Sequence, residues 1–411
     1  MSKKVIQIGK IAKLNFKTLR ESDNLSVIQY LDTGNITKDE IQNLQILNIK
    51  QGRFPSRAKR RVKENTIIYS TVRPNQKHYG ILKSPNKNLI VSTGFTTIDI
   101  INKKNDPKFI YYLLTQNQIT EHLHKIGMNG TSSYPSIKPE DIGNLKFIIP
   151  ENIQDQQKIA SVFSTIDSKI ELNNKINTEL EQMAKTLYDY WFVQFDFPVP
   201  KNSPLEGWTA SLDGVEETKP YKTSGGAMVY SQELKRHIPK GWEVKKISDL
   251  LPVITGKQDA NFATENGEYN FFTCGEEILK CNSYEFEGKA VLIAGNGNFG
   301  IKLYEGKFNA YQRTYILMPN NEKHYTIIYL AVKDKIQSFK NSSRGSIIKF
   351  ITKGDIENIL IPLPKDKDLD VFTQLNNITE KIEKNLEENQ KLAELRDFLL
   401  PMLMNGQIVV E

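Results

Sequence analysis

The feature that most constrains this chain is a run of heptad-spaced apolar and small residues between Gln154 and Phe192. Those residues are Ile159, Phe163, Ile166, Ile170, Leu180, Ala184, Leu187 and Trp191, and two asparagines, Asn173 and Asn177, interrupt the same seam. A heptad pattern of this length predicts a helix that packs along its whole length against another helix. At about 1.5 Å per residue such a helix spans roughly 50 Å, which is too long for one compact domain. We therefore expect a spacer helix over residues 151–195.

A partner helix is predicted near the C-terminus, within residues 365–411. Lys381–Leu392 reads KIEKNLEENQKL and resembles Lys169–Leu180, KIELNNKINTEL, at an offset of 212 residues. Both asparagine interruptions recur, and polar seam residues fix register and orientation at a cost in stability, so one defined pairing is expected. The alternative is that asparagine is merely tolerated at a wet seam. The residues expected to pair the helices are Ile159, Phe163, Ile166, Ile170, Asn173, Asn177, Leu180, Leu187, Leu375, Ile378, Ile382, Asn385, Asn389, Leu392 and Leu399.

The length of 411 residues is enough for two or three domains, and the composition is typical of a protein in a reducing compartment. Its two cysteines, Cys274 and Cys281, lie in a Lys-rich chain, and their C-x6-C spacing is a poor zinc signal. No apolar run approaches a membrane span, and the start MSKKVIQIGK lacks the apolar region of a signal peptide. We expect a cytoplasmic protein that holds no metal.

The net charge of +7 is distributed unevenly. Residues 1–150 hold 24 Lys and Arg against 11 Asp and Glu, whereas residues 241–364 hold 15 against 14. The helical stretches 151–196 and 365–411 each carry a net charge of −4. A basic globular surface favours a polyanion such as DNA, and acidic helices favour a protein partner or water.

Residues 1–150 are predicted to form a mixed α/β domain. Strand-like runs and one amphipathic helical run alternate with turn signals, at Thr66–Val72, Leu89–Ser92, Thr97–Ile101, Pro107–Ile126 (the helix) and Leu145–Ile149.

Two predicted loops of this domain have the chemistry of DNA contact. The first, Gly52–Lys63, is basic and broken by Pro55, which suits phosphate contact, although a solvated basic loop without a ligand is the alternative. The second, Gly130–Pro135 (GTSSYP), offers hydroxyl and backbone N–H groups, but such turns are common. The candidate DNA-binding residues of the first domain are Arg53, Arg57, Lys59, Arg60, Arg61, Arg73, Thr131, Ser132, Ser133 and Tyr134.

The pattern then repeats. Residues 196–240 are rich in Pro, Gly, Ser and Thr and are predicted to be a linker, and a second α/β domain follows at 241–364. Val244–Leu250 resembles Ile8–Leu14 at an offset of 236, and Asp355, Ile356, Asn358 and Pro364 match residues 141–150 at an offset of 214. The predicted fold is α+β: two α/β domains and two long antiparallel helices that form a coiled coil, in a pseudo-two-fold repeat.

The second domain contains a G-x-G-x-x-G string, Gly295–Gly300, after a strand-like run. A dinucleotide site would continue into a helix, but here the sequence alternates like strands, so a glycine turn that approaches a ligand is the preferred interpretation. The candidate DNA-binding residues of this domain are Asn296, Asn298, Gln312, Arg313, Ser343 and Arg344. The chain carries no recognisable catalytic motif, which predicts a protein that is not an enzyme by itself.

Several stretches together resemble one family, the specificity subunit of type I restriction-modification enzymes. They are GTSSYPSIKPEDIGNLKFIIP (Gly130–Pro150) leading into QQKIA (Gln156–Ala160), NNKINTELEQMAKTLYDYWFVQFDFP (Asn173–Pro198), YKTSGGAMVYSQELKRHIPKGWEV (Tyr221–Val244) and DIENILIPLP (Asp355–Pro364). The resemblance runs from end to end of the chain.

This resemblance implies that each domain reads one half of a split double-stranded DNA target and that the helices set the gap. It also implies docking of two adenine-methyltransferase subunits and of restriction subunits that translocate DNA. S-adenosylmethionine, ATP and magnesium would serve those partners, and this chain would bind no cofactor. The second domain is nearly neutral, although two DNA-reading domains would both be expected to be basic. We therefore expect the first domain to contribute more of the salt-dependent affinity, and local patches such as Lys302–Lys307 or Arg344–Lys353 to contact DNA in the second.

Two other classes of function are the alternatives. The first is a helical-rod adaptor that joins two binding modules without reading sequence. Its DNA binding would be strong and salt-sensitive, and its affinity would not depend on the DNA sequence. An enzyme in its own right would methylate or cut DNA as the purified chain.

Overall fold

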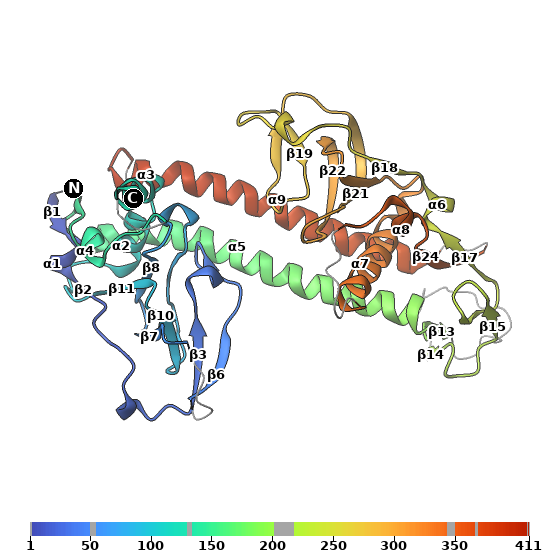
Figure 1. The fold of residues 1–411 in the computed structure, drawn as a ribbon, viewed down its shortest axis with the longest axis horizontal. Helices are drawn as coiled ribbons and strands as arrows, with labels where there is room; N and C mark the ends of the chain where they lie inside the picture. Colours follow the sequence, from blue (N-terminus) through green and yellow to red (C-terminus); the bar gives the residue numbers. More distant parts are fainter. Residues whose placement is uncertain are drawn as a thin grey trace. The chain divides into compact units, whose positions relative to one another are not determined.

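The computed structural model describes residues 2–49, 55–129, 134–200, 218–342, 350–365, 369–408 and 410. The chain divides into two compact units (Figure 1). Unit 1 contains Met1–Glu171 and Asn389–Glu411, and unit 2 contains Leu172–Glu388. Each unit therefore combines one globular domain with part of both long helices, whereas the sequence predicted the helices as separate segments.

The two long helices are α5 (Ile153–Tyr188), which ends in a π-helical turn at Asp189–Val193, and α9 (Asp370–Met404). At about 1.5 Å per residue, α5 is roughly 54 Å long. Its start is fastened to the first domain by buried Gln156, whose side chain accepts a hydrogen bond from the Asp106 backbone N–H (2.9 Å) and donates one to the Pro150 carbonyl (2.9 Å).

The helices run antiparallel within each unit. In unit 1, Arg396 of α9 donates to Asp167 of α5 at 2.9 Å, while the earlier residue Phe163 shares a core cluster with the later residue Leu400. In unit 2, Asn385 contacts Asn177, and the earlier residue Phe372 of α9 stacks on Phe192, which follows α5. Later positions on α5 thus meet earlier positions on α9, and the predicted fold class is confirmed.

None of the predicted seam residues is fully exposed. Buried among them are Ile159, Phe163, Ile166, Asn173, Asn177, Leu375 and Asn385. Half-buried are Ile170, Leu180, Leu187, Ile378, Ile382, Asn389, Leu392 and Leu399.

Unit 1 contains two four-stranded sheets. The first has the order β2-β11-β8-β9, with strands Ala12–Leu14, Phe95–Ile100, Ile67–Ser70 and Tyr79–Ile81. The second has the order β6-β3-β10-β7, with strands Gln45–Asn48, Val27–Leu31, Leu89–Ser92 and Ala58–Arg61. Short pieces complete the domain: β1 (Lys3–Gln7) paired with β12 (Lys146–Pro150), β4 (Ile36–Thr37) paired with β5 (Glu40–Ile41), and the helical turns α1 (Ile8–Ile11) and α4 (Pro139–Gly143).

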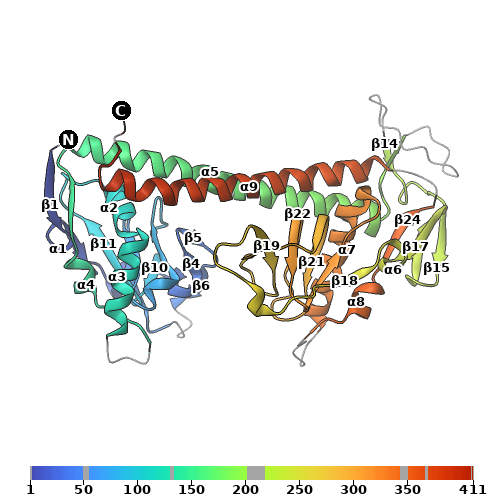
Figure 2. The same ribbon diagram turned by 90° about the horizontal axis from the view of Figure 1, so that it is seen from above.

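The single helix predicted over Pro107–Ile126 is two helices, α2 (Pro107–Leu114) and α3 (Asn117–Met128). The extended backbone of Gln116 (φ −57°, ψ 141°) separates them, although the apolar period continues across the break. Figure 2 shows α2 beside α5 and α9 in this unit, and its side chains share a core with Phe163 and Leu400.

Unit 2 is built on one six-stranded sheet of order β18-β23-β21-β22-β19-β20. Its strands are Val253–Thr255, Thr314–Leu317, Phe286–Ala294, Ile301–Ala310, Tyr269–Phe272 and Leu279–Cys281. The helix α7 (Tyr325–Ser342), the turns α6 (Ile247–Leu250) and α8 (Lys353–Glu357), and the ribbon of β17 (Trp242–Lys246) with β24 (Leu360–Pro364) complete the domain.

The described parts of the segment predicted as a linker, residues 196–200 and 218–240, are packed into unit 2. It contains β13 (Pro198–Pro200) paired with β14 (Thr218–Pro220), and β15 (Met228–Ser231) paired with β16 (Arg236–Pro239). Phe197 stacks on Trp191 and on Tyr221, with ring centroids 4.8 Å apart in both pairs, and all three side chains are buried. These aromatic residues close the end of α5, a role that the Pro- and Gly-rich composition of the segment did not indicate.

Strand pairing defines the internal repeat at residue level. In unit 1 Lys3 pairs with Pro150, and in unit 2 Trp242 pairs with Pro364. Because Pro150 and Pro364 correspond, residue 3 corresponds to residue 242, an offset of 239 rather than the predicted 236. The same offset equates Leu14, which pairs with Ile98, with Val253, which pairs with Leu317. The sheet β2-β11-β8-β9 is therefore the counterpart of β18-β23-β21-β22.

A tyrosine fastens each globular domain to a long helix. In unit 1 the Tyr112 hydroxyl of α2 donates to Asp167 of α5 at 2.6 Å, and in unit 2 the Tyr325 hydroxyl of α7 donates to Glu383 of α9 at 2.9 Å. The repeat thus uses the same chemistry at both domain-to-helix contacts. Among the described residues, no helix has the length and apolar character that crossing a bilayer requires.

Candidate nucleic-acid interface

Four segments of unit 1 meet at one edge of the sheet β2-β11-β8-β9. Thr71, which follows β8, donates its backbone N–H to the Gly94 carbonyl (2.8 Å) and accepts one from Ile137 (2.9 Å). The Arg73 N–H donates to the Pro135 carbonyl (2.8 Å), and the Thr93 N–H donates to the Arg57 carbonyl (2.8 Å). We call the group 71–73, 93–94 and 134–137, together with Arg57, edge 1.

Edge 1 gathers three predicted DNA-binding residues from distant parts of the sequence. The side chains of Arg57 and Arg73 are exposed, and Tyr134 is 40% exposed. Arg73 has a left-handed backbone (φ 46°) that directs the chain into the following Pro74 turn. Two guanidinium groups on one exposed edge suit contact with phosphates.

Part of the predicted basic loop is a strand, and its residues 52–54 lie outside the described part of the chain. Ala58–Arg61 is β7, which pairs antiparallel with β10, so Arg60 faces Val91 and Arg61 faces Ile90 across the ladder. Arg61 is bound in an ion pair with Asp23, and Arg60 is half-buried, which lowers the pKa of its guanidinium. Among the basic residues of the stretch that the structure describes, Arg57 and Lys59 are the more exposed candidates.

Some candidates lie outside the described residues, and the structure says nothing of them. They are Arg53, Thr131, Ser132, Ser133, Ser343 and Arg344.

Unit 2 has a matching edge. Gly295, which follows β21, donates its backbone N–H to the Arg313 carbonyl (2.9 Å) and accepts one from Ile351 (2.8 Å), and Asn296 forms a β-bridge with Phe350. We call the group 295–298, 311–313 and 350–351 edge 2. It holds the candidates Asn296, Asn298, Gln312 and Arg313, of which the last three are exposed.

The glycine string Gly295–Gly300 forms the turn between the antiparallel strands β21 and β22. A Cβ at Gly295 would lie 2.6 Å from the Arg313 carbonyl oxygen, and Gly297 has φ +71°. Gly295 is therefore required by close approach of the chain to itself and Gly297 by turn geometry, whereas a Cβ at Gly300 would meet no atom within 4 Å. A strand-to-strand turn cannot form the strand-to-helix phosphate cradle of a dinucleotide site.

The two edges occupy equivalent places in the repeat. Thr71 and Gly295 make the same pair of backbone hydrogen bonds, with Gly94 and Ile137 in unit 1 and with Arg313 and Ile351 in unit 2. Ile137 and Ile351 are related by the same offset of 214 that relates α4 to α8. At both helical turns an aspartate caps the backbone N–H three residues earlier, Asp141 at 2.7 Å and Asp355 at 2.8 Å.

Edge 2 presents less free positive charge than edge 1. Near it, the Lys302 ammonium donates to the Gly275 carbonyl (2.7 Å), and burial lowers the pKa of this lysine. The Asn298 side chain donates to Glu276 at 3.1 Å. Sequence reasoning missed Phe350, an exposed phenylalanine on edge 2, because nothing in the local pattern IIKFITK separates it from a core residue.

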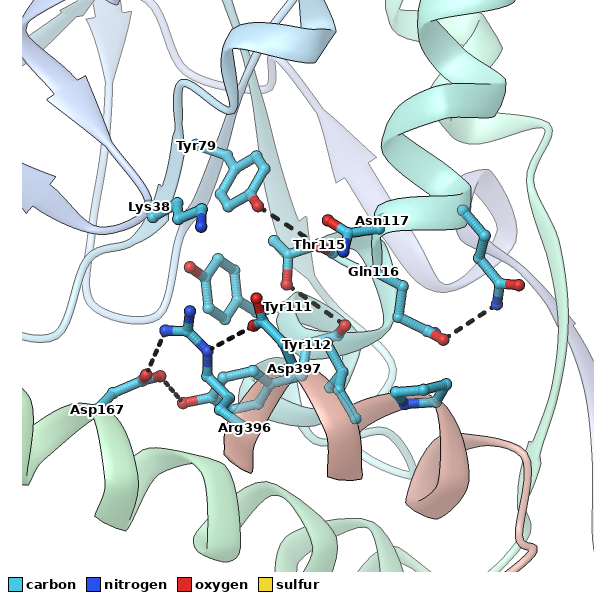
Figure 3. A pocket seen from close by; sticks show the side chains of 13 residues that line it. Lys38, Tyr79, Tyr111, Tyr112, Thr115, Gln116, Asn117, Asp167, Arg396 and Asp397 are labelled. Atoms are coloured by element: carbon cyan, nitrogen blue, oxygen red, sulfur yellow. Dashed lines mark hydrogen bonds and ion pairs between the residues drawn. The ribbon is translucent and has the colours of Figure 1, made fainter. Parts of the chain in front are cut away.

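Unit 1 also contains a cavity of about 150 Å³ between the first domain and α9 (Figure 3). Tyr79, Tyr111 and Arg396 line it, and the carboxyl of Asp39 lies close by, with its pKa raised to about 6 by burial. The cavity belongs to the contact between domain and helix and is separate from edge 1. Among the described residues, no three His, Cys, Asp or Glu side chains are grouped as metal ligands.

Comparison with known proteins identifies the family. The family model for the type I restriction modification DNA specificity domain matches residues 2–182 and 239–392. The HindI type I restriction enzyme specificity subunit of Haemophilus influenzae is 26% identical over 93% of this chain and 94% of its own length. The EcoDI specificity subunit of Escherichia coli is 38% identical over 42% of this chain and 40% of its own.

A comparison with solved structures supports the fold. The S subunit of a type I restriction-modification system from M. genitalium superposes with a TM-score of 0.55 at 16% identity, and the match covers 98% of this chain and 96% of that chain. The family model covers both domains and much of both long helices, so the match includes edge 1, edge 2 and the seam residues except Leu187 and Leu399. The chain therefore belongs to the specificity subunits of type I restriction-modification enzymes, which supply DNA sequence specificity and are not catalytic themselves.

Proposed function

We propose that edge 1 and edge 2 each read one half of a bipartite double-stranded DNA target. The observation that carries this proposal is the shared backbone geometry of the edges: the hydrogen bonds of Thr71 recur at Gly295. Candidate residues lie on both of these equivalent edges: Arg57, Arg73 and Tyr134 on edge 1, and Asn296, Asn298, Gln312 and Arg313 on edge 2. A duplicated surface that presents different side chains is what reading two different half-sites requires.

The side chains of the two edges differ in the part of DNA that they suit. Arg57 and Arg73 of edge 1 contact phosphates, as does neighbouring Lys59 of β7. The amides of Asn296 and Gln312 on edge 2 have the paired donor and acceptor that recognise a base edge in the major groove, and Arg313 suits guanine.

The long helices set the gap between half-sites and dock two methyltransferase subunits. Large apolar side chains are exposed on both helices: Leu172, Met183 and Leu386 in unit 2, and Leu395 and Phe398 in unit 1. Apolar residues on an acidic helical surface favour a protein partner over a phosphate backbone. Restriction subunits join the same complex.

The partners supply the chemistry of the complex. S-adenosylmethionine serves the methyltransferase, ATP and magnesium serve the restriction subunits, and this chain binds no cofactor of its own. The complex acts in the cytoplasm, where the two thiols, Cys274 and Cys281, stay reduced.

Binding competition with the reconstituted complex tests the proposal against the adaptor alternative. Unlabelled DNA that carries either half-site alone, or both half-sites at a changed gap, should compete at least 100-fold less well than the intact target, since specific sites bind about 10³–10⁷ more tightly than non-specific DNA. Equal competition by DNA of unrelated sequence would favour the adaptor.

A further inference from the structure

Phe350 is an exposed phenylalanine held in place by its backbone. Its side chain is 64% exposed, although the next residue, Ile351, is buried. The Ile351 N–H donates to the Gly295 carbonyl (2.8 Å), and the Ile351 carbonyl accepts from the Tyr315 hydroxyl (2.9 Å). The chain at this point is thus fixed to the core while the aromatic ring remains in water, where its apolar area gains nothing from burial.

The position is on edge 2, and its counterpart in edge 1 is not aromatic. Phe350 bridges Asn296 as Ser136 bridges Val72, and the offset of 214 relates Phe350 to Ser136. Edge 1 presents exposed Arg57 and Arg73, which can bind phosphates, whereas edge 2 lies in a domain with almost no net charge. An aromatic ring is the non-electrostatic means of holding DNA that the less basic edge has available.

Methylation of a base by the partner subunit is a reaction in which an exposed aromatic ring can take part. Enzymes that modify a base inside a duplex extrude it from the stack, which costs a few kcal/mol of unstacking and unpairing. Proteins that distort DNA insert apolar side chains, phenylalanine among them, between base steps to stabilise the unstacked form. The neighbouring Asn296, Gln312 and Arg313 would hold the base edges and place the ring at the stack.

We propose that Phe350 is a positioning residue that inserts its ring into the base stack of the second half-site and stabilises the DNA from which the methyltransferase extrudes its target adenine. This inference rests on the proposed function, in which edge 2 reads that half-site. It predicts that the two half-sites differ at this position: the second depends on the ring of Phe350, whereas Ser136 stands in its place on edge 1.

The test uses the complex of this chain with its methyltransferase and the complete target duplex. The adenine that is methylated is replaced by fluorescent 2-aminopurine in one half-site at a time. Phe350→Ala should reduce the fluorescence increase on binding in one half-site and leave the other unchanged, and Phe350→Trp should retain the increase in both. The affinity of Phe350→Ala for the intact target should fall about tenfold, in line with the removal of one aromatic stack.

An abasic duplex separates a wedge from a simple contact. Removing the target base in the second half-site removes the cost of extrusion, so Phe350→Ala should bind that duplex within about twofold of the unsubstituted complex. Equal reductions in affinity on intact and abasic DNA would assign Phe350 an ordinary contact and overturn the wedge, and no reduction on either would remove it from the interface. Failure of the unsubstituted complex to prefer its target would instead refute the proposed function.

Discussion

Asn385 donates a hydrogen bond from its side-chain amide to the side-chain oxygen of Asn177 at 2.7 Å, inside the seam between α9 and α5. Both side chains are buried, and the amide nitrogen of Asn177 has no hydrogen-bond partner in the described part of the chain. An apolar pair would be more stable here, so the asparagines are suited to fixing one register rather than to adding stability.

The first prediction concerns that register. The double variant Asn177→Leu, Asn385→Leu should unfold at a higher denaturant concentration than the unsubstituted chain but lose the single alignment of the helices. Asn177→Leu alone should lower the free energy of unfolding by about 1–3 kcal/mol, because it leaves the Asn385 amide unpaired in the seam. Denaturant unfolding measures the first effect, and the spread of distances between spin labels on α5 and α9 measures the second. A double variant with one sharp distance would show that other contacts fix the register.

The second prediction concerns the tyrosines that join domain to helix. Removing the hydroxyl in Tyr112→Phe or Tyr325→Phe should lower the free energy of unfolding by about 1.5–3 kcal/mol, because each leaves a partly buried carboxylate, Asp167 or Glu383, without this donor. Tyr230→Phe is the matched control, since the Tyr230 side chain is 52% exposed. A change no larger than in the control would mean that water replaces the missing hydroxyl.

The third prediction concerns pH. Burial raises the pKa of Asp39 to about 6 from an ordinary value of 3.8, in a site that also contains the Tyr111 hydroxyl, Asp167 and Lys83. A carboxyl whose pKa is higher in the folded state stabilises the fold while protonated, so this contribution is complete below pH 3.8 and is lost as pH rises through 6.

The free energy of unfolding should therefore decline between about pH 4.5 and 7, and Asp39→Asn should remove this decline because asparagine stays neutral at every pH. The asparagine side-chain oxygen can still accept the hydrogen bond from the Ile81 N–H. The decline attributable to Asp39 should be on the order of 1–2 kcal/mol. Identical pH profiles of the two proteins would show that this carboxyl is ionised without cost.

The fourth prediction concerns salt. The double variant Arg57→Ala, Arg73→Ala should weaken DNA binding by the complex and flatten the plot of log affinity against log salt by up to about one unit for each phosphate that is no longer neutralised. Lys103→Ala is the matched control, because Lys103 is exposed beyond the end of β11 that lies away from edge 1. Equal slopes for the double variant and the control would remove edge 1 from the phosphate-binding surface. Arg61→Ala, by contrast, should reduce stability more than binding, since Arg61 is paired with Asp23.

The parts of the fold that were predictable depend on periodic or repeated sequence. The heptads of α5 and α9, the asparagines on their seam and the division into two repeats all appear as spacing within short stretches. The same is true of the turn at Gly295–Gly300, because alternation of side chains after it excludes a helix.

The rest depends on contacts between residues far apart in the sequence. The stretch around Arg60 becomes strand β7 only through pairing with β10, and Asp23 engages Arg61 across 38 positions. The aromatic stack of Trp191, Phe197 and Tyr221 packs a segment that composition assigned to a linker. Edge 1 and edge 2 are defined by backbone hydrogen bonds, which no side-chain pattern encodes, so their equivalence was accessible only from the fold.

A single-molecule map of DNA methylation in the source cell, with and without this gene, tests the central claim most directly. The account predicts that one bipartite motif, with a methyladenine in each half, disappears when the gene is deleted and returns when it is restored. If every methylated motif persists after deletion in a cell that expresses the chain and its partners, the chain does not direct methylation there and the claim is contradicted.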